Sequence, residues 1–439
     1  MSAAYDKSKF KKGFWPFVAL QFQGAFSDNV YRYTLVYLLV RASGVEPTME
    51  NTGTISGIAG MVFAIPFFLF VGIFGAISDR LPKKSVTFYS KSLEAVIMTL
   101  GGIAFYTVSP MLLWATLFLM AAQSAIFTPC KYGILPEAVP EEKLSWANGI
   151  IQGTTMVAIL AGAGLSGPLC EWLYGAGGDG PGVQWVSPFL VALAFVGIML
   201  SRSMFNPPAA NPELSIPLNP YSGLGKYARV FWNDRWIGIA LLSYAFFWGM
   251  AMLINMNLFP YGYVTLGLTE TSISMMMAAV TIGIASGAFA AGHISRGKVE
   301  PGLVPIGALG MAVCALFLGF SNESFLSASL LLFGLGFFGG LFDVPVAAML
   351  QQRSPAHMRG GILVFTNMCS WLGIFTAALL FLGATSIGID AQTIFLFAAA
   401  AIVAFGGYIM IAQPVFFLRT VLWLISNTLY RIRVVGRQN

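Results

Sequence analysis

The sequence predicts an all-α membrane protein with twelve transmembrane helices. Hydrophobic residues make up 57% of the chain and charged residues only 10%, whereas soluble proteins carry about 25% charged residues. Apolar runs of about 20 residues, each long enough to cross a hydrocarbon core of roughly 30 Å as a helix, recur along nearly the whole length. The loops between these runs are short, so no soluble domain fits inside them.

Each predicted helix is one such run, in chain order. The first six are 15–40, 52–78, 86–107, 110–130, 145–170 and 184–202. The second six are 235–260, 271–293, 301–320, 324–350, 361–385 and 391–413. Residues 203–234 are rich in proline and polar side chains, which is typical of a linker. The sequence therefore predicts an N-terminal half (1–202), a linker (203–234), a C-terminal half (235–413) and a tail (414–439).

The basic residues predict the orientation. Of the 24 lysines and arginines, all but Arg32 and Arg41 fall in segments on the same side as the N-terminus. By the positive-inside rule both termini are cytoplasmic. The net charge of +6 then follows from topology, and nucleic-acid binding is not expected. Neither the four cysteines nor the two histidines have metal or disulfide spacing, so no metal and no cofactor is expected.

Two pairs of loops indicate an internal repeat. GAISDRLPKK (75–84) resembles AGHISRGK (291–298), and PEEKLSWANG (140–149) resembles PAHMRGGILVFTN (355–367). Aligning Lys83 with Lys298 and Pro140 with Pro355 gives the same offset of 215 positions. Two six-helix halves related by an axis along the membrane normal are the architecture of major facilitator transporters, whose substrate site lies between the halves near the midplane. The sequence therefore predicts that fold.

The loop GAISDRLPKK also resembles the signature loop of that superfamily. Its glycine would permit close helix approach, and its aspartate would accept hydrogen bonds from a basic side chain and a helix N-terminus, forming a cytoplasmic latch. The alternative is that its charges only set topology. A lysine and a glutamate three residues apart in the third helix are expected to form an ion pair in the same region. The predicted cytoplasmic gate comprises Gly75, Asp79, Arg80, Lys83, Lys84, Lys91 and Glu94.

The first helix, with LQFQGAFSDNVYRYTLVYLL at 20–39, carries charges at its middle. A charge at the bilayer centre costs roughly 2.5–3.5 kcal/mol, so such residues face a partner or a cavity. Asp28 and Arg32 are four residues apart and can pair with each other on one helix face. The functional alternative is that Asp28 and Asn29, with Arg32 nearby, line the central cavity and bind a polar head group or a coupling cation.

Two further ionisable residues lie in predicted helices. Asp343, in GGLFDVPVAAML, follows two glycines and precedes Pro345, which would loosen the helix beside a cavity. Asp343 either faces the cavity or bonds a neighbouring helix at a kink. Lys131 is predicted at the inner end of the fourth helix, where its side chain could snorkel to the interface.

Three passages resemble the bacterial lysophospholipid transporters of the major facilitator superfamily: QFQGAFSDNVYR, AIFTPCKYGILPEAVPEEKLSWANG and LQQRSPAHMRGGILVFTN. The resemblance implies a protein that takes lysophospholipid from the outer to the inner leaflet of the bacterial inner membrane for reacylation by an acyltransferase. It places the motif's acid, asparagine and lysine on Asp28, Asn29 and Lys131, and the asparagine at the start of the eleventh helix on Asn367. Asp343 departs from the family pattern, which has an apolar residue there.

The tail, 414–439, alternates apolar residues with arginines, as a basic amphipathic helix on the inner face would. Its end, TLYRIRVVGRQN, resembles the entry to an acyltransferase domain in fused proteins. We therefore expect the chain to be the transporter part of such a fusion, the alternative being a plain anchor. The His-x4-Asp motif of acyltransferases is absent, so this chain is not expected to be an enzyme.

The predicted mechanism is alternating access by rocking of the two halves. Asp28, Asn29 and Arg32 would form a polar floor, and the faces SMMMAAV (274–280) and FFGGLF (337–342) would hold the acyl chain or simply pack the core. No ATP-binding motif is visible, which leaves a Na⁺ or H⁺ gradient or the lipid gradient as the driving force. Two other functions stay open: an ion-coupled transporter of a small soluble or drug-like substrate, and a non-transporting membrane scaffold for an acyltransferase.

Overall fold

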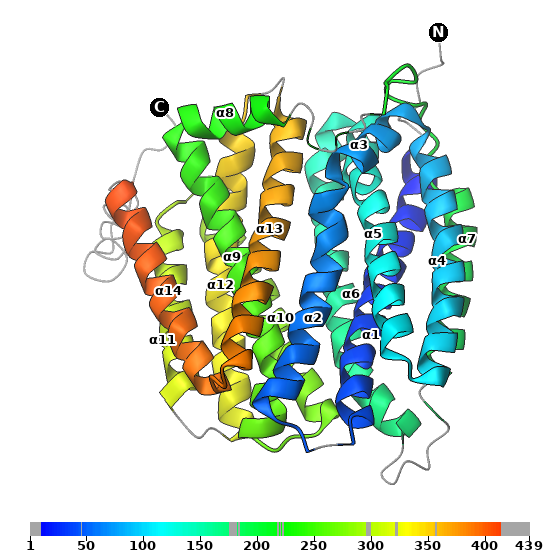
Figure 1. The fold of residues 1–439 in the computed structure, drawn as a ribbon. Helices are drawn as coiled ribbons and strands as arrows, with labels where there is room; N and C mark the ends of the chain where they lie inside the picture. The colour runs from blue at the N-terminus through cyan, green and yellow to red at the C-terminus, as the bar shows by residue number, and fades with distance from the viewer. Residues whose placement is uncertain are drawn as a thin grey trace.

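The computed structural model is a bundle of long helices that run side by side (Figure 1). The structure describes residues 10–413, apart from residues 45, 175–181, 183–184, 217–218, 220, 222–223, 296–299, 321–323 and 356–357. The predicted amphipathic tail, 414–439, lies outside the described residues. We call the end of the bundle where α1 begins the N-terminal face (top in Figure 1) and the opposite end the far face.

The helices follow the predicted order. The N-terminal half contains α1 (Phe10–Ala42), α2 (Met49–Leu69), α3 (Val71–Arg80), α4 (Lys83–Thr107), α5 (Pro110–Ala138), α6 (Glu141–Tyr174) and α7 (Val186–Ser203). The rest of the chain contains α8 (Gly225–Asn233), α9 (Arg235–Pro260), the π-helix η3 (Tyr261–Thr265), α10 (Glu270–Ser295), α11 (Leu303–Phe320), α12 (Phe325–Arg353), α13 (Arg359–Ser386) and α14 (Ala391–Ala412). Each predicted range except 52–78 overlaps one of these helices, and most of the helices extend beyond the predicted ends.

The prediction of one continuous helix at 52–78 was wrong. The chain forms two helices there, α2 and α3, with a break at Phe70, whose φ of −108° and ψ of 8° leave the α-helical region. The carbonyl of Pro66 still accepts the amide of Phe70, so the break is confined to the backbone of Phe70 itself.

Hydropathy identifies most of the helices that could cross a membrane. Within the described residues, nine helical stretches are long and apolar enough to cross a membrane, and Pro188–Ser203 is apolar but shorter. The chain is therefore a multi-pass membrane protein. Helices α1 and α4 are not among the nine, because each carries several charged side chains, and α1 carries amide side chains as well. These two helices supply much of the polar interior described below.

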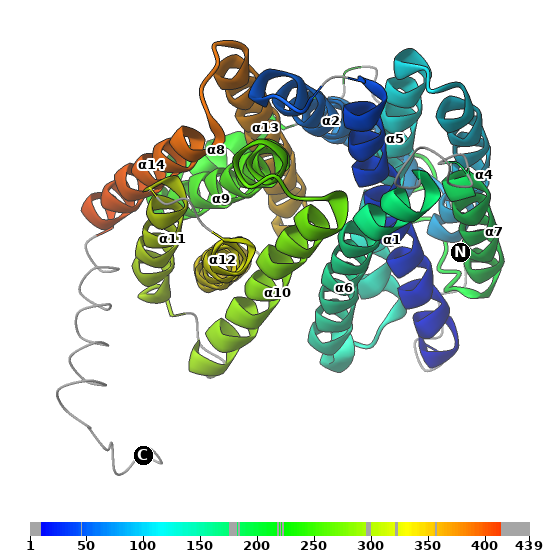
Figure 2. The ribbon, with the colours of Figure 1, turned by 90° about the horizontal axis from the view of Figure 1, so that it is seen from below.

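The helix boundaries repeat with the offset found in the loops. Helix α12 begins 215 positions after α5 begins, at 325 and 110, and ends 215 positions after α5 ends, at 353 and 138. The ends of α3 and α10, at 80 and 295, have the same separation. Figure 2 shows the two sets of helices, α1–α7 and α8–α14, side by side. The main contacts between the halves are α2 with α13 and α6 with α10.

The predicted linker contains a helix. Its last part forms α8, which lies across the N-terminal face and contacts α9 and α13 (Figure 1). Phe231 of α8 stacks on Phe365 of α13 with ring centroids 5.2 Å apart. The short amphipathic helix therefore caps the C-terminal half.

Glycines allow α10 and α12 to pack closely. A Cβ added at Gly283 or Gly287 of α10 would meet the carbonyl oxygens of Phe333 and Phe337 of α12. Without side chains at these positions the two backbones can touch, which is how small residues drive helix association in membranes.

Gly287→Ala is expected to lower the free energy of unfolding by about 1–3 kcal/mol, because a methyl group must displace backbone in a filled site. The measurement is the thermal midpoint of the purified protein in detergent. Gly292→Ala is the matched control on the same helix, since a Cβ there meets nothing within 4 Å. Equal midpoints for the two variants would contradict the close packing.

Candidate functional site

Asp28 of α1 is buried, with 8% of its surface exposed. Its Oδ2 accepts a hydrogen bond of 2.6 Å from the hydroxyl of Ser124 in α5. Its Oδ1 is buried and has no hydrogen-bond partner among the described residues. A buried carboxylate oxygen without a partner is costly, so this oxygen is a candidate ligand for a cationic group.

The alternative in which Asp28 pairs with Arg32 is wrong. Arg32 instead donates to Asn29 Oδ1 at 3.3 Å and to the hydroxyl of Tyr33 at 2.6 Å. Its guanidinium also lies over the rings of Tyr33 and Phe63, 4.5 and 5.1 Å from their centroids. The carboxylate of Asp28 is therefore not neutralised by its helix neighbour.

Lys131 of α5 belongs to a second polar group. Its Nζ donates to the hydroxyl of Thr155 in α6 at 2.8 Å, and that hydroxyl donates to Gln21 Oε1 at 2.9 Å. The amide nitrogen of Gln21 donates to Thr154 at 2.8 Å. The predicted end of this helix near Lys131 was wrong, because α5 continues to Ala138. The side chain bonds inward and does not snorkel, which the sequence had left as one possibility.

The two polar groups form one column between α1, α5 and α6. Gln21 and Asp28 are seven residues apart on α1, and Ser124 and Lys131 are seven residues apart on α5, which runs in the opposite direction. At 1.5 Å per residue, seven residues correspond to about 10.5 Å along a helix. A carboxylate thus stands about 10 Å from a lysine along the bundle axis.

Lys91 and Glu94 of α4 form the predicted ion pair, at 2.6 Å, and each side chain is only 1% exposed. Gln23 of α1 joins them, accepting from Lys91 at 2.8 Å and donating to Glu94 at 2.7 Å. All three lie within the N-terminal half, so the pair holds α1 to α4. Its predicted role in the gate stays a prediction.

The loop predicted to form a latch is open in this structure. Asp79 and Arg80 are exposed, and neither side chain has a hydrogen bond or ion pair among the described residues. A Cβ at Gly75 would meet nothing within 4 Å, so the expectation of close helix approach at this glycine was wrong. Lys83 pairs instead with Glu137 of α5 at 2.5 Å, and Lys84 donates to the carbonyl of Arg202 at 2.6 Å.

The two halves are joined near the far face by an ion pair that sequence reasoning missed. Arg41 of α1 donates two hydrogen bonds to Glu270 of α10, at 2.5 and 2.9 Å. The carboxylate is 4% exposed and the guanidinium 27%. The sequence did contain a signal. Arg41 is the one basic residue in a loop on the predicted non-cytoplasmic side, so the positive-inside rule does not explain its charge.

Hydrogen bonds surround this ion pair. The hydroxyls of Tyr37 and Ser274 are 2.8 Å apart, and the amide of Gly167 also donates to Ser274, at 3.0 Å. The amide of Thr271 donates to Glu171 at 2.9 Å. We call these residues, together with Arg41 and Glu270, the far-face contact.

Nearer the middle of the bundle, a second contact joins the halves. The side-chain amide of Asn255 in α9 donates to the hydroxyl of Tyr33 at 3.0 Å, which connects Arg32 to the C-terminal half.

Two predicted residues of the C-terminal half do not join the column. Asp343 of α12 has a buried Oδ1 without a hydrogen-bond partner among the described residues. Asn367 lies two turns inside α13 and not at its start, and its carbonyl accepts from Ser370. In the part of the chain that the structure describes, no cluster of three or more His, Cys, Asp or Glu side chains could hold a metal ion.

Comparisons with known proteins agree with this architecture. A family model described as Major Facilitator Superfamily matches residues 17–378. The lysophospholipid transporter LplT of Cronobacter sakazakii (strain ATCC BAA-894) is 28% identical over 397 residues, covering 88% of this chain and 91% of that protein. LplT of Enterobacter sp. (strain 638) is 29% identical over 395 residues, covering 89% and 92%.

Solved structures support the fold. A mutant of the nucleoside transporter NupG superposes with a TM-score of 0.67 at 12% identity, covering 91% of this chain and 99% of that one. A POT family transporter in complex with a thioalcohol-conjugated peptide gives a TM-score of 0.69 at 13% identity, with coverage of 94% and 99%. At these identities the likeness concerns the arrangement of the helices.

Proposed function

This chain belongs to the Major Facilitator Superfamily, and from that premise we propose that it is a transporter that moves lysophospholipid across the bilayer of the bacterial inner membrane, from the outer to the inner leaflet. The observation that carries the proposal is the polar column between α1, α5 and α6, in which Asp28 and Lys131 stand about 10 Å apart along the helix axis. The LplT proteins, named for lysophospholipid transport, are similar over most of the chain, which supports the same substrate class.

The column suits a zwitterionic head group. The ammonium of Lys131 would bind the phosphate, and the free oxygen of Asp28 would accept from the amine of an ethanolamine-type head group. Gln21 and Thr155 offer further hydrogen bonds to phosphate and glycerol oxygens. Asn29 and Arg32 lie beside the carboxylate and connect it, through Tyr33, to the C-terminal half. In this scheme the polar side chains of the column replace the water molecules that the head group loses when it leaves the membrane surface.

The coupling ion would bind to a buried aspartate. Asp28 is the proposed site for Na⁺ or H⁺ when no amine is bound, and Asp343 is the second candidate. Neither has an ionic partner among the described residues, so either can change its charge without breaking an ion pair. A charge that is neutralised before it moves through hydrocarbon avoids several kcal/mol of desolvation cost.

The far-face contact, where the two halves meet, supports a proposed inward-facing state. In that state the N-terminal face is the cytoplasmic one, as the basic residues predict. Rocking would break the Arg41–Glu270 pair and bring Asp79 and Arg80 into contact with the other half. Reacylation of the delivered lipid would then fall to an acyltransferase, linked to this chain or separate from it.

The test is lysophosphatidylethanolamine movement between leaflets in proteoliposomes, with and without imposed Na⁺ or H⁺ gradients. We expect movement that needs the protein, and acceleration by one gradient would identify the coupling ion. Movement no faster than in empty liposomes would overturn the proposal. Saturable uptake of a water-soluble compound would then indicate a soluble substrate, and a change only in the activity of an added acyltransferase would indicate a scaffold.

A further inference from the structure

Arg32 of α1 lies inside the bundle and has no carboxylate in an ion pair with it among the described residues. It interacts electrostatically with Asp28 but does not bond it. Both of its hydrogen bonds, to Asn29 and Tyr33, leave from Nη2. The N–H groups of Nε and Nη1 therefore have no acceptor in the part of the chain that the structure describes. A charge inside a membrane needs a partner or a ligand, and a guanidinium fits phosphate oxygens with two parallel hydrogen bonds.

Two aromatic rings hold this guanidinium in place. Its carbon Cζ lies 4.5 Å from the ring centre of Tyr33 and 5.1 Å from that of Phe63 in α2. Such rings stabilise a cation without neutralising it. Arg32 is half-buried, so its charge stays available to an anion. The charges of Lys91 and Arg41, in contrast, are already balanced by glutamates.

Arg32 and Lys131 lie on opposite sides of Asp28 along the bundle axis. Helix α1 begins at the N-terminal face, so Arg32, four residues after Asp28, lies about 6 Å nearer the far face. Lys131 lies about 10 Å nearer the N-terminal face. With the predicted orientation the far face is the outer one. A head group that comes from the outer leaflet would therefore reach Arg32 before Lys131.

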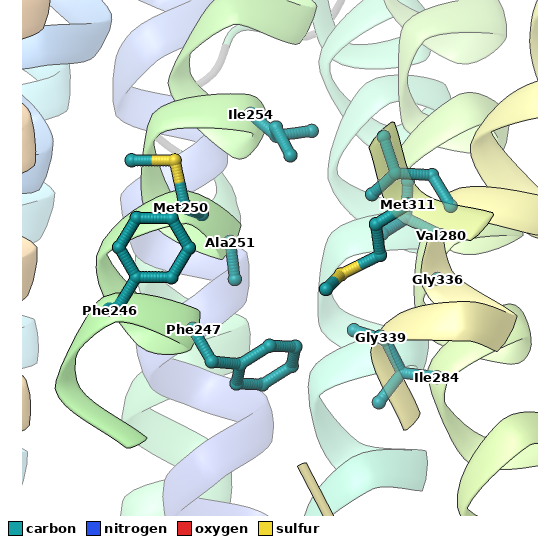
Figure 3. Close-up of a pocket in the computed structure, with 11 residues that line it drawn as sticks. Phe246, Phe247, Met250, Ala251, Ile254, Val280, Ile284, Met311, Gly336 and Gly339 are labelled. Atoms are coloured by element: carbon teal, nitrogen blue, oxygen red, sulfur yellow. The ribbon is translucent and has the colours of Figure 1, made fainter. Parts of the chain in front are cut away.

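Helix α9 connects this site to the C-terminal half. In Figure 3, Phe247 and Ile254 project from α9 toward Met311 and the other side chains of that half. The cavity between them has a volume of about 20 Å³, the space of one water molecule, so α9 is closely packed there. Asn255 follows Ile254 about 100° around the helix, and its side-chain amide instead donates to Tyr33 at 3.0 Å. Rocking of the halves would therefore carry Asn255 away from α1.

We propose that Arg32 is a phosphate site that is open in the outward-facing state and closed in the conformation described here. The inference rests on the proposed function and adds where the phosphate of the lipid binds first. In this structure Asn255 holds the hydroxyl of Tyr33, and that hydroxyl accepts a hydrogen bond of 2.6 Å from Arg32. When the far face opens, Asn255 leaves, Tyr33 is released and the guanidinium binds the phosphate. When the halves meet again, the hydroxyl displaces the phosphate, which passes to Lys131.

The test compares variants whose effects should have opposite signs. In proteoliposomes, Arg32→Gln is expected to raise the half-saturating concentration of lysophosphatidylethanolamine about tenfold, the size typical of a lost hydrogen bond to a charged group. Arg32→Lys should restore part of this loss. Tyr33→Phe removes the competing hydroxyl, so it should lower the half-saturating concentration about threefold and slow the release of the lipid. Asn255→Ala should act in the same direction as Tyr33→Phe.

Asn257→Ala is the matched control. This asparagine belongs to the same helix, but its amide donates to the carbonyl of Ala391 in α14 at 2.8 Å, within the C-terminal half. It should leave the half-saturating concentration unchanged. The thermal midpoint in detergent checks that each variant is folded. Inorganic phosphate outside the liposomes should not compete with the lipid, and competition that is lost in Arg32→Gln would assign the site to free phosphate and overturn the lipid assignment.

The remaining outcomes separate this inference from the proposed function. Unchanged half-saturating concentrations in folded Arg32→Gln and Tyr33→Phe would overturn the inference while the wild type still transports. A change in the same direction in both variants would also overturn it, because competition between Tyr33 and the phosphate requires opposite signs. Absence of transport by the wild type would instead refute the proposed function.

Discussion

Asp28→Asn is expected to reduce lysophosphatidylethanolamine transport at least about thirtyfold, because losing one partner of a buried charge pair costs about 2–5 kcal/mol. Asparagine keeps the size of the side chain and can still accept the hydrogen bond from Ser124, so the fold should survive. The measurement is the initial rate in proteoliposomes, with the thermal midpoint in detergent as the check on folding.

Lysophosphatidylglycerol is the control substrate for this variant. It has the phosphate but not the amine, so its transport does not require the charge of Asp28 to bind an ammonium. We therefore expect a much smaller loss for this lipid. Equal losses for both lipids at an unchanged thermal midpoint would assign Asp28 to ion coupling instead of head-group recognition, and full activity with both would remove Asp28 from the site.

Glu270→Gln is expected to open the far face and to slow transport. The substitution leaves the guanidinium of Arg41 without its anion. After allowance for the exposed part of Arg41, the loss is about 2 kcal/mol. Such a change shifts the ratio of two conformations by roughly thirtyfold. A transporter held in one state cycles slowly, so the rate should fall even though no residue of the polar column has changed.

The rate at which Cys170 is labelled measures how far the far face opens. Cys170 is fully buried and interacts electrostatically with both Glu270 and Arg41. With Cys130, Cys314 and Cys369 replaced by alanine, a membrane-impermeant thiol reagent should label Cys170 slowly in the parent and faster in Glu270→Gln. The charge exchange Arg41→Glu with Glu270→Arg should restore slow labelling and transport. Labelling that does not respond to any of these changes would show that the ion pair does not hold the halves together.

The charged residues of the column could be predicted from the sequence, whereas the ion pair of the far-face contact could not. Asp28 and Lys131 stood out because a charge within an apolar run has a high cost, whatever its neighbours are. The pairing of Lys91 with Glu94 followed from their spacing of three on one helix. Arg41 and Glu270 are separated by 229 positions, and nothing local marks them as partners.

The membrane class, the order of the helices, the two related halves and the residues with costly charges could all be predicted from the sequence alone. Hydrophobicity and helical period are local properties, and the hydrocarbon core imposes them on each segment separately. The tertiary structure was needed to find that Asp28 bonds Ser124 and not Arg32, that Lys131 bonds inward to Thr155, and that Arg41 pairs with Glu270 across the two halves. Those outcomes depend on how each helix is rotated and tilted against its neighbours, which is set by close packing at positions such as Gly287 and not by composition.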